Sequence, residues 1–179
     1  KKSAKTQPIE VRTEVQKQIL DFISGRLKVV LNEAGYKHDV VDAVLGAQSS
    51  NPAASARAVK QLQAWVGRED WPTILAGYAR CVRITRDQKQ TFQIKEKSLR
   101  EVEERTLYEV LNLQPTNFNG NVDAFLKVVV VLLPSITSFF EKILVMAEEK
   151  DVMENRLGLL QRIASLANGV ADLSKLEGF

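Results

Sequence analysis

Residues 151–172, DVMENRLGLLQRIASLANGVAD, decide the fold class, because apolar side chains recur there at three- and four-residue steps. This spacing predicts a helix with one apolar side. That side is formed by Val152, Leu160, Ile163 and Ala167. Arg156 falls in the middle of it, where an unpaired charge is costly. We therefore expect either a carboxylate partner for Arg156 or an apolar side that is not all core.

Most of the remaining chain shows the same helical spacing. The predicted helices cover residues 9–33, 39–45, 52–66, 71–86, 99–113, 122–133 and 135–146, with Pro134 restarting or kinking the last pair. The polar stretch 86–97 is predicted to be a loop. VVVVLL, residues 128–133, is β-branched enough for a strand, but its flanks favour a buried helix. The sequence thus predicts an all-α bundle of about seven helices, with a flexible tail over residues 1–8 and one domain over residues 9–179.

Several residues mark the expected helix ends. Asn51 before Pro52 and Asp70 before Pro72 are typical N-caps. Ser98, with Glu101 three residues later, has the spacing of a capping box. Gly35 stands where a helix C-terminal cap is expected.

The first predicted helix carries an apolar seam that we expect to join the core. It consists of Val11, Val15, Ile19, Phe22, Ile23, Leu27, Val30 and Leu31. Acidic pairs such as Glu103–Glu104 and Glu148–Glu149 are interpreted instead as solvated faces.

Composition limits the function classes. Hydrophobic residues make up 45% and the formal net charge is +3, which is ordinary globular composition and does not by itself demand a nucleic-acid partner. The single Cys81 excludes an intramolecular disulfide and favours a reducing compartment. No signal peptide is expected in KKSAKTQPIE. The longest apolar run, residues 125–133, is too short for a membrane span.

Catalysis by this chain alone is not expected. His38–Asp39 resembles the pair found in metal-dependent phosphohydrolases, but such a site needs several histidines and the chain has one. One Cys and one His also exclude a structural zinc site, so we expect no metal ligands. No phosphate-binding glycine motif or nucleophile elbow occurs. Cys81 lies on the apolar side of its helix and is predicted to be core.

The helix at residues 71–86 is basic on the side opposite to its apolar residues. Arg80, Arg83 and Arg86 are three residues apart and form a stripe that can follow a phosphate backbone. Lys89, Lys95, Lys97 and Arg100 continue the positive charge into the following loop. An ordinary solvated face is the alternative, because Asp87 and Glu96 dilute the field.

Many separated blocks of the chain resemble the β subunit of bacterial-type glycyl-tRNA synthetases, over about residues 15 to 177. The C-terminal matches are Phe139, Phe140, Glu141, Val145, Met146, Ala147, Asn155, Arg156, Leu157, Leu159, Leu160, Ala171, Asp172, Ser174, Lys175 and Leu176. The earlier matches are Arg26, Leu27, Gly35, Tyr36, Asp39, Val40, Asp42, Ala43, Val44, Leu45, Leu107, Tyr108 and Glu109.

The resemblance implies a C-terminal anticodon-binding domain of the helical DALR type, which binds glycine tRNA within an assembly of α and β chains. Catalysis, with ATP and Mg²⁺, would belong to the α chain, so no cofactor is expected here. The compartment would be the bacterial cytoplasm, or a plastid or mitochondrion. A protein-docking module with little RNA contact is the rival interpretation.

The resemblance and the basic stripe together suggest the tRNA-binding residues Arg80, Arg83, Arg86, Lys89, Lys95, Lys97, Asn155 and Arg156. Asn155 is a candidate base-edge contact. Arg156 has two interpretations: an RNA contact, or a structural partner of a carboxylate such as Asp42, Asp123 or Glu141, the role that its apolar neighbours favour. The family's DALR motif falls on residues 151–154, DVME, where only Asp151 matches and a glutamate replaces the arginine.

Overall fold

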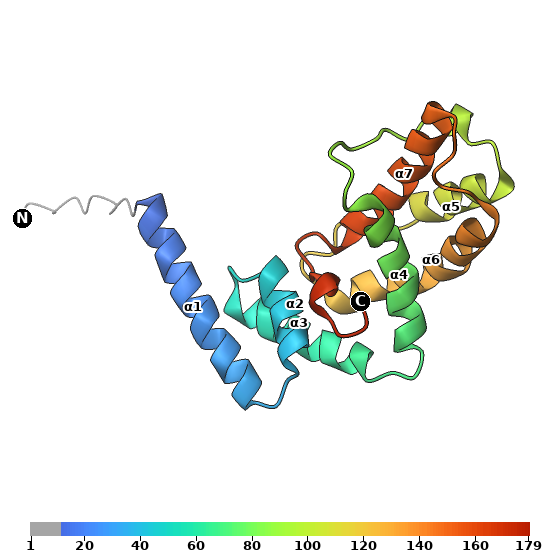
Figure 1. Cartoon of the computed structure of the whole chain (residues 1–179). Helices are drawn as coiled ribbons and strands as arrows, with labels where there is room; N and C mark the ends of the chain where they lie inside the picture. Colours follow the sequence, from blue (N-terminus) through green and yellow to red (C-terminus); the bar gives the residue numbers. More distant parts are fainter. Residues whose placement is uncertain (1–11) are drawn as a thin grey trace, which may run out of the picture.

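The computed structural model describes residues 12–179 (Figure 1). Within this range the chain forms seven α-helices, three short 3₁₀ turns and no strand. The helices are α1 (Thr13–Glu33), α2 (His38–Ala47), α3 (Pro52–Val66), α4 (Trp71–Thr85), α5 (Val102–Asn112), α6 (Val122–Lys142) and α7 (Lys150–Ala164). The all-α prediction is confirmed. The expected tail over residues 1–8, the helix start at Ile9 and the seam residue Val11 lie outside the described residues.

Helix α6 is the centre of the bundle. It packs against α3, α4 and α5, and α7 lies across α4 and α5 (Figure 1). Phe125 and Phe139 on α6 are the largest fully buried side chains among the described residues. By length and composition α6 resembles a membrane span, but its buried side chains belong to the core of this bundle.

The helix ends match the sequence in part. The Asn51 side chain caps α3 by accepting a hydrogen bond from the Ala54 amide at 3.1 Å, as predicted. Gly35, at φ 89°, turns the chain after α1, as predicted. Asp70 precedes α4 but makes no capping bond, because its carboxylate accepts from the Arg68 guanidinium instead.

The predicted capping box at Ser98 is wrong. Helix α5 begins at Val102, and the reciprocal box is formed by Glu101 and Glu104. Ser98 lies in the short 3₁₀ turn η1 (Glu96–Ser98) that precedes it.

The last two helices differ from the prediction in length. Helix α6 continues through Pro134. Proline has no N–H to donate to the Val130 carbonyl four residues earlier, but Pro134 is exposed, so that this carbonyl can bind water. It ends at Lys142 because Ile143 turns to an extended conformation and becomes buried. Helix α7 ends at Ala164 instead of continuing to residue 172, since the chain turns through η2 (Ser165–Ala167) and Gly169 at φ 69°.

The predicted burial of the α1 seam is wrong for most of its length. Only Leu31 is buried and Leu27 half-buried, whereas the other described seam residues are exposed. These exposed residues are Val15, Ile19, Phe22, Ile23 and Val30. The reason is tertiary: α1 packs only on α2 and α3, and it projects from the edge of the bundle (Figure 1).

Candidate nucleic-acid interface

The three arginines of α4 lie on its exposed side, opposite a face that buries Ile74, Leu75, Tyr78 and Cys81. This division follows from the amphipathic spacing of the helix. Arg80 and Arg83 form no ion pair among the described residues. Arg86 at the C-cap lies 3.8 Å from Asp87, and both side chains are exposed, so their attraction is weak. The helix therefore presents positive charge that internal acids do not neutralise.

Two aromatic rings from distant parts of the chain support this stripe. The Arg80 guanidinium lies 4.2 Å from the ring centroid of Phe140, at the end of α6. The Arg83 guanidinium lies 5.5 Å from the ring of Phe179, the last residue. Such cation–π contacts orient a guanidinium while leaving its N–H edges free. The sequence suggested neither ring as a support, because spacing along one helix says nothing about a neighbour 60 or more residues away.

The loop after α4 crosses α7 as an extended strap, residues 90–95. Side-chain amides of α7 bond its backbone at both ends. The Gln161 amide accepts from the Phe92 N–H at 2.9 Å and donates to the Gln90 carbonyl at 2.9 Å. The Asn155 Oδ1 accepts from the Lys95 N–H at 2.6 Å. Hydrogen bonds to α7 thus hold the predicted loop in place.

Gly158 lies between Asn155 and Gln161, on the side of α7 that faces the strap. A β-carbon at this position would stand 3.0 Å from the Phe92 carbonyl oxygen and 3.3 Å from Ile94. Only glycine lets the strap approach the helix this closely. Lys95 lies on the strap, and Lys89 and Lys97 lie just before and after it. All three lysines are exposed and form no ion pair within the described part of the chain.

Two of the predicted tRNA-binding residues lie in the interior. Asn155 is 3% exposed and its carbonyl oxygen is occupied by the strap. Arg156 is 9% exposed; its Nε donates to the buried Glu104, and its Nη1 donates to the Leu144 carbonyl at 2.9 Å. The tRNA contact predicted for both residues needs an exposed side chain, whereas both side chains are buried and bonded within the protein. The structural interpretation of Arg156 is confirmed, but its partner is Glu104 and none of the three acids proposed.

The buried Glu104 is fully hydrogen-bonded. Its second oxygen accepts from the Arg100 and Glu101 backbone N–H groups at 2.6 and 3.0 Å. The prediction of a solvated Glu103–Glu104 face is wrong for Glu104, which is 1% exposed. Arg100, unlike the arginines of α4, is neutralised by Glu149; this hydrogen bond lowers the pKa of Glu149.

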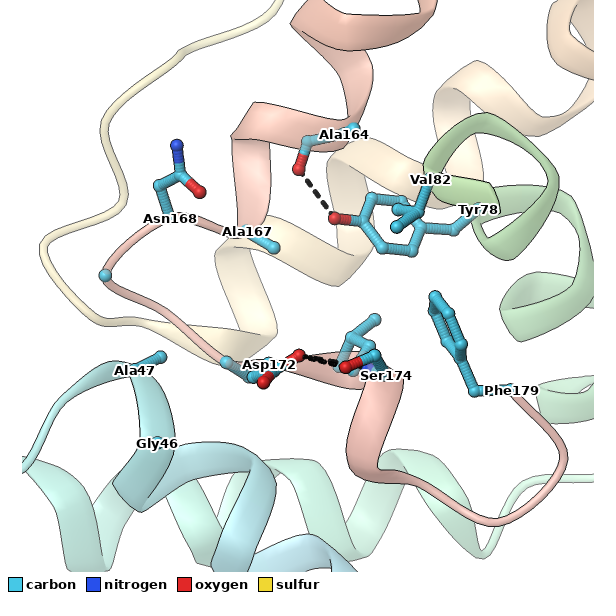
Figure 2. Close-up of a pocket in the computed structure, with 13 residues that line it drawn as sticks. Gly46, Ala47, Tyr78, Val82, Ala164, Ala167, Asn168, Asp172, Ser174 and Phe179 are labelled. Carbon is cyan, nitrogen blue, oxygen red and sulfur yellow. Dashed lines mark hydrogen bonds between the residues drawn. The ribbon is translucent and has the colours of Figure 1, made fainter. Parts of the chain in front are cut away.

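Two cavities open beside the stripe. The first, about 460 Å³, lies between the end of α2, helix α4, the end of α7 and the C-terminal segment (Figure 2). The second, about 690 Å³, lies under the strap and includes Lys89, Tyr108 and Arg162. Ala164 and Asn168 line both. The cationic surface is therefore adjacent to two recesses of sufficient size for a planar ring.

The buried groups beneath the stripe have no nucleophilic role. Burial raises the pKa of the Cys81 thiol to about 12, so it stays protonated near neutral pH. Burial also raises the pKa of Tyr78, whose hydroxyl donates to the Ala164 carbonyl at 2.7 Å (Figure 2). The prediction that Cys81 belongs to the core is confirmed.

Comparison with known proteins adds the family context. No protein-family model matches the sequence. The glycine–tRNA ligase β subunit of Moorella thermoacetica is 33% identical over 174 residues, or 94% of this chain, and that of Myxococcus xanthus is 35% identical over 170 residues, or 90%. The chloroplastic/mitochondrial glycine–tRNA ligase 2 of Arabidopsis thaliana is 31% identical over 181 residues, or 99%.

The alignments cover only 25%, 24% and 17% of these relatives. The chain thus spans a quarter or less of their length. The helical bundle, with its α4 stripe and strap, corresponds to that shared segment. Over 90% or more of its length, this chain is similar to part of two glycine–tRNA ligase β subunits and to part of a chloroplastic/mitochondrial glycine–tRNA ligase.

Proposed function

We propose that this chain is an anticodon-binding domain of the DALR type, which binds the anticodon stem-loop of glycine tRNA and so supports glycyl-tRNA synthesis. The observation that carries the proposal is the stripe of Arg80, Arg83 and Arg86, which is exposed and, at Arg80 and Arg83, free of acidic partners among residues 12–179. The names of the relatives supply the nature of the RNA.

The geometry suits a looped single strand. Arginines held over Phe140 and Phe179 keep their N–H edges toward solvent, where phosphate oxygens can accept them. Lysines on the strap extend the positive surface beyond the helix end. Unpaired loop bases are free to enter the adjacent recesses. Asn155 and Arg156 serve this surface from within, by fixing the strap and the segment before α7.

Ligation itself is assigned to other parts of the enzyme. In this proposal the α chain binds ATP, Mg²⁺ and glycine, and the chain described here binds no cofactor. The compartment follows the relatives: the bacterial cytoplasm, or a plastid or mitochondrion.

A matched pair of variants tests the proposal. Arg80→Ala/Arg83→Ala removes two charges from the stripe, whereas Arg57→Ala/Lys60→Ala removes two exposed charges from α3. Because each lost phosphate contact lowers the salt slope by about 0.7 for a single strand, the stripe variant should reduce the slope of log Kd against log salt by about 1.4. Filter binding with glycine tRNA measures this. Equal effects of the two double variants would reject the stripe as the RNA contact.

A protein-docking role is the second candidate, and α1 is the observation that favours it. Its exposed apolar residues include Phe22, at 70% exposure, and Val30, at 59%. Large exposed apolar patches mark interaction surfaces. The partner would be another part of the ligase. Binding through this face would be insensitive to salt, whereas RNA binding through the stripe weakens steeply as salt rises.

A further inference from the structure

The cavity in Figure 2 lies between α4, the helix that carries the arginine stripe, and the C-terminal segment. Six of its thirteen lining residues are glycine or alanine, which leave room for a ligand. Those small lining residues are Gly46, Ala47, Ala164, Ala167, Gly169 and Ala171. The volume of about 460 Å³ exceeds that of a single nucleobase.

One wall of this cavity is aromatic and connected to the stripe. The Phe179 ring stands at the cavity beside Tyr78 and Val82 (Figure 2). The Arg83 guanidinium lies 5.5 Å from the Phe179 ring centroid. A strand whose phosphate is held by Arg83 therefore has an aromatic face next to it. Stacking on such a ring is favourable for every base.

The floor of the cavity supplies a hydrogen-bond acceptor. Asp172 Oδ1 accepts from the Ser174 N–H at 3.2 Å and from the Ser174 hydroxyl at 2.6 Å (Figure 2). The other oxygen, Oδ2, has no hydrogen-bond partner among the described residues. Because an ionised carboxylate only accepts, the ligand must bring an N–H or O–H donor to it, and on a nucleobase the donor is an N–H.

We propose that this cavity binds one unstacked nucleobase that carries an exocyclic amino group, stacked on Phe179 and donating its amino proton to Asp172. The inference rests on the proposed RNA-binding function and adds a base preference to it. Adenine, cytosine and guanine each present an amino donor. Uracil presents carbonyl oxygens on either side of its one N–H, and these oxygens repel a carboxylate. The cavity therefore discriminates against uracil.

The larger cavity under the strap is a weaker candidate for reading a base. Both ends of the Gln161 amide are used by the strap backbone. Arg162 donates to Asn112 at 2.5 Å, and the Thr85 hydroxyl donates to the Cys81 carbonyl at 2.7 Å. The Gln161, Arg162 and Thr85 side chains that line it thus already have partners.

A set of RNA hairpins tests the base preference. Each has the anticodon stem-loop of glycine tRNA, with one loop base at a time replaced by uracil. At one position the replacement should weaken binding to the unmodified chain about ten-fold, the scale of one good base contact. In Asp172→Asn this penalty should fall to less than two-fold, because an amide can both donate and accept. Asn also keeps an acceptor for Ser174.

One control and one further variant accompany this test. Asp21→Asn, which removes an exposed carboxylate from α1, should leave the penalty unchanged. Phe179→Leu keeps the apolar bulk but removes the aromatic face, and should weaken binding of all amino-base hairpins several-fold. Thermal unfolding checks that each variant is folded.

The outcomes are distinguishable. Salt-dependent binding by the unmodified chain, with the uracil penalty unchanged in Asp172→Asn, overturns the base-binding cavity and leaves the RNA-binding function standing. Absence of any hairpin binding overturns both. Loss of the penalty in Asp172→Asn alone supports the inference.

Discussion

Helices α1 and α7 have similar apolar spacing in the sequence, but α1 is largely exposed and α7 is largely buried. Helix α1 exposes Val15, Ile19 and Phe22, whereas α7 buries an asparagine, an arginine and a glycine. Periodicity tells which residues share a side of a helix. It does not tell whether another element covers that side.

Partners explain the difference. On α7, the Arg156 charge is matched by Glu104, and Asn155 is satisfied by the Lys95 backbone. The polar groups thus remain hydrogen-bonded after they leave water. Along α1, no described element covers the residues before Leu27, so even a phenylalanine stays in solvent.

The largest expected effect comes from removing the buried cation. Arg156→Met should lower the free energy of unfolding by about 3–5 kcal/mol, because it leaves Glu104 as an unpaired charge in the core. Urea unfolding, followed by circular dichroism, measures this.

A double variant separates the ion pair from simple packing. Glu104→Gln/Arg156→Met removes both charges, while the glutamine oxygen can still accept from the Arg100 and Glu101 N–H groups. It should recover much of the lost stability. A double variant as unstable as Arg156→Met would mean that volume, and not charge, holds α7 in place.

Arg156 shows how far the sequence alone predicts the fold. Its position on the apolar side followed from spacing, and so did the need for a carboxylate. The partner did not follow, because Glu104 is 52 residues away and sits beside Glu103 in what resembles a solvated acidic pair. Local patterns placed the seven helices; the contacts between them depend on distant residues that no local pattern names.

The candidate interface was predictable to a similar extent. The arginine stripe followed from three-residue spacing on α4. The rings under it, the clips at Asn155 and Gln161 and the recess beside Phe179 did not, since each pairs residues 60 or more positions apart. Sequence therefore predicted where charge is presented, while the structure was needed to find what orients it.

The second prediction concerns two helical glycines, whose replacement by alanine should change the free energy of unfolding in opposite directions. In Gly25→Ala, the new β-carbon meets nothing within 4 Å, so α1 should gain about 0.5–1 kcal/mol from helix propensity. In Gly158→Ala, the β-carbon presses on the Phe92 carbonyl at 3.0 Å, so the strap must move and we expect a net loss of about 1 kcal/mol.

Stability and RNA binding should be measured together for this pair. Gly158→Ala is expected to weaken tRNA binding as the strap lysines shift, while Gly25→Ala leaves it unchanged. Stabilisation by both substitutions would show that the strap is loose on α7.

A smaller effect is expected in the pH dependence of stability. Glu149 and Glu103 have lowered pKa values because they accept hydrogen bonds from Arg100 and Lys142. Their contribution is present above the ordinary carboxyl pKa of 4.5 and is lost as pH falls through the lower folded-state value. Glu103→Gln/Glu149→Gln should therefore have a lower thermal midpoint than the unmodified chain at pH 7, and the gap should narrow toward pH 3. A gap that is constant with pH would show that these pairs add no charge-dependent stability.

The smallest effect is expected on α1. Phe22→Ser removes a large apolar side chain that is 70% exposed, so the free energy of unfolding should change by only about 0.5 kcal/mol. Phenylalanine and serine have similar helix propensities, which leaves burial as the only term of size. Urea unfolding and sedimentation of both proteins at several concentrations test this. A loss of 2 kcal/mol or more that grows with protein concentration would mean that a second copy covers α1 in solution. In that case the contrast between the two helices would reflect a missing partner for α1, since its spacing already resembles that of a buried helix.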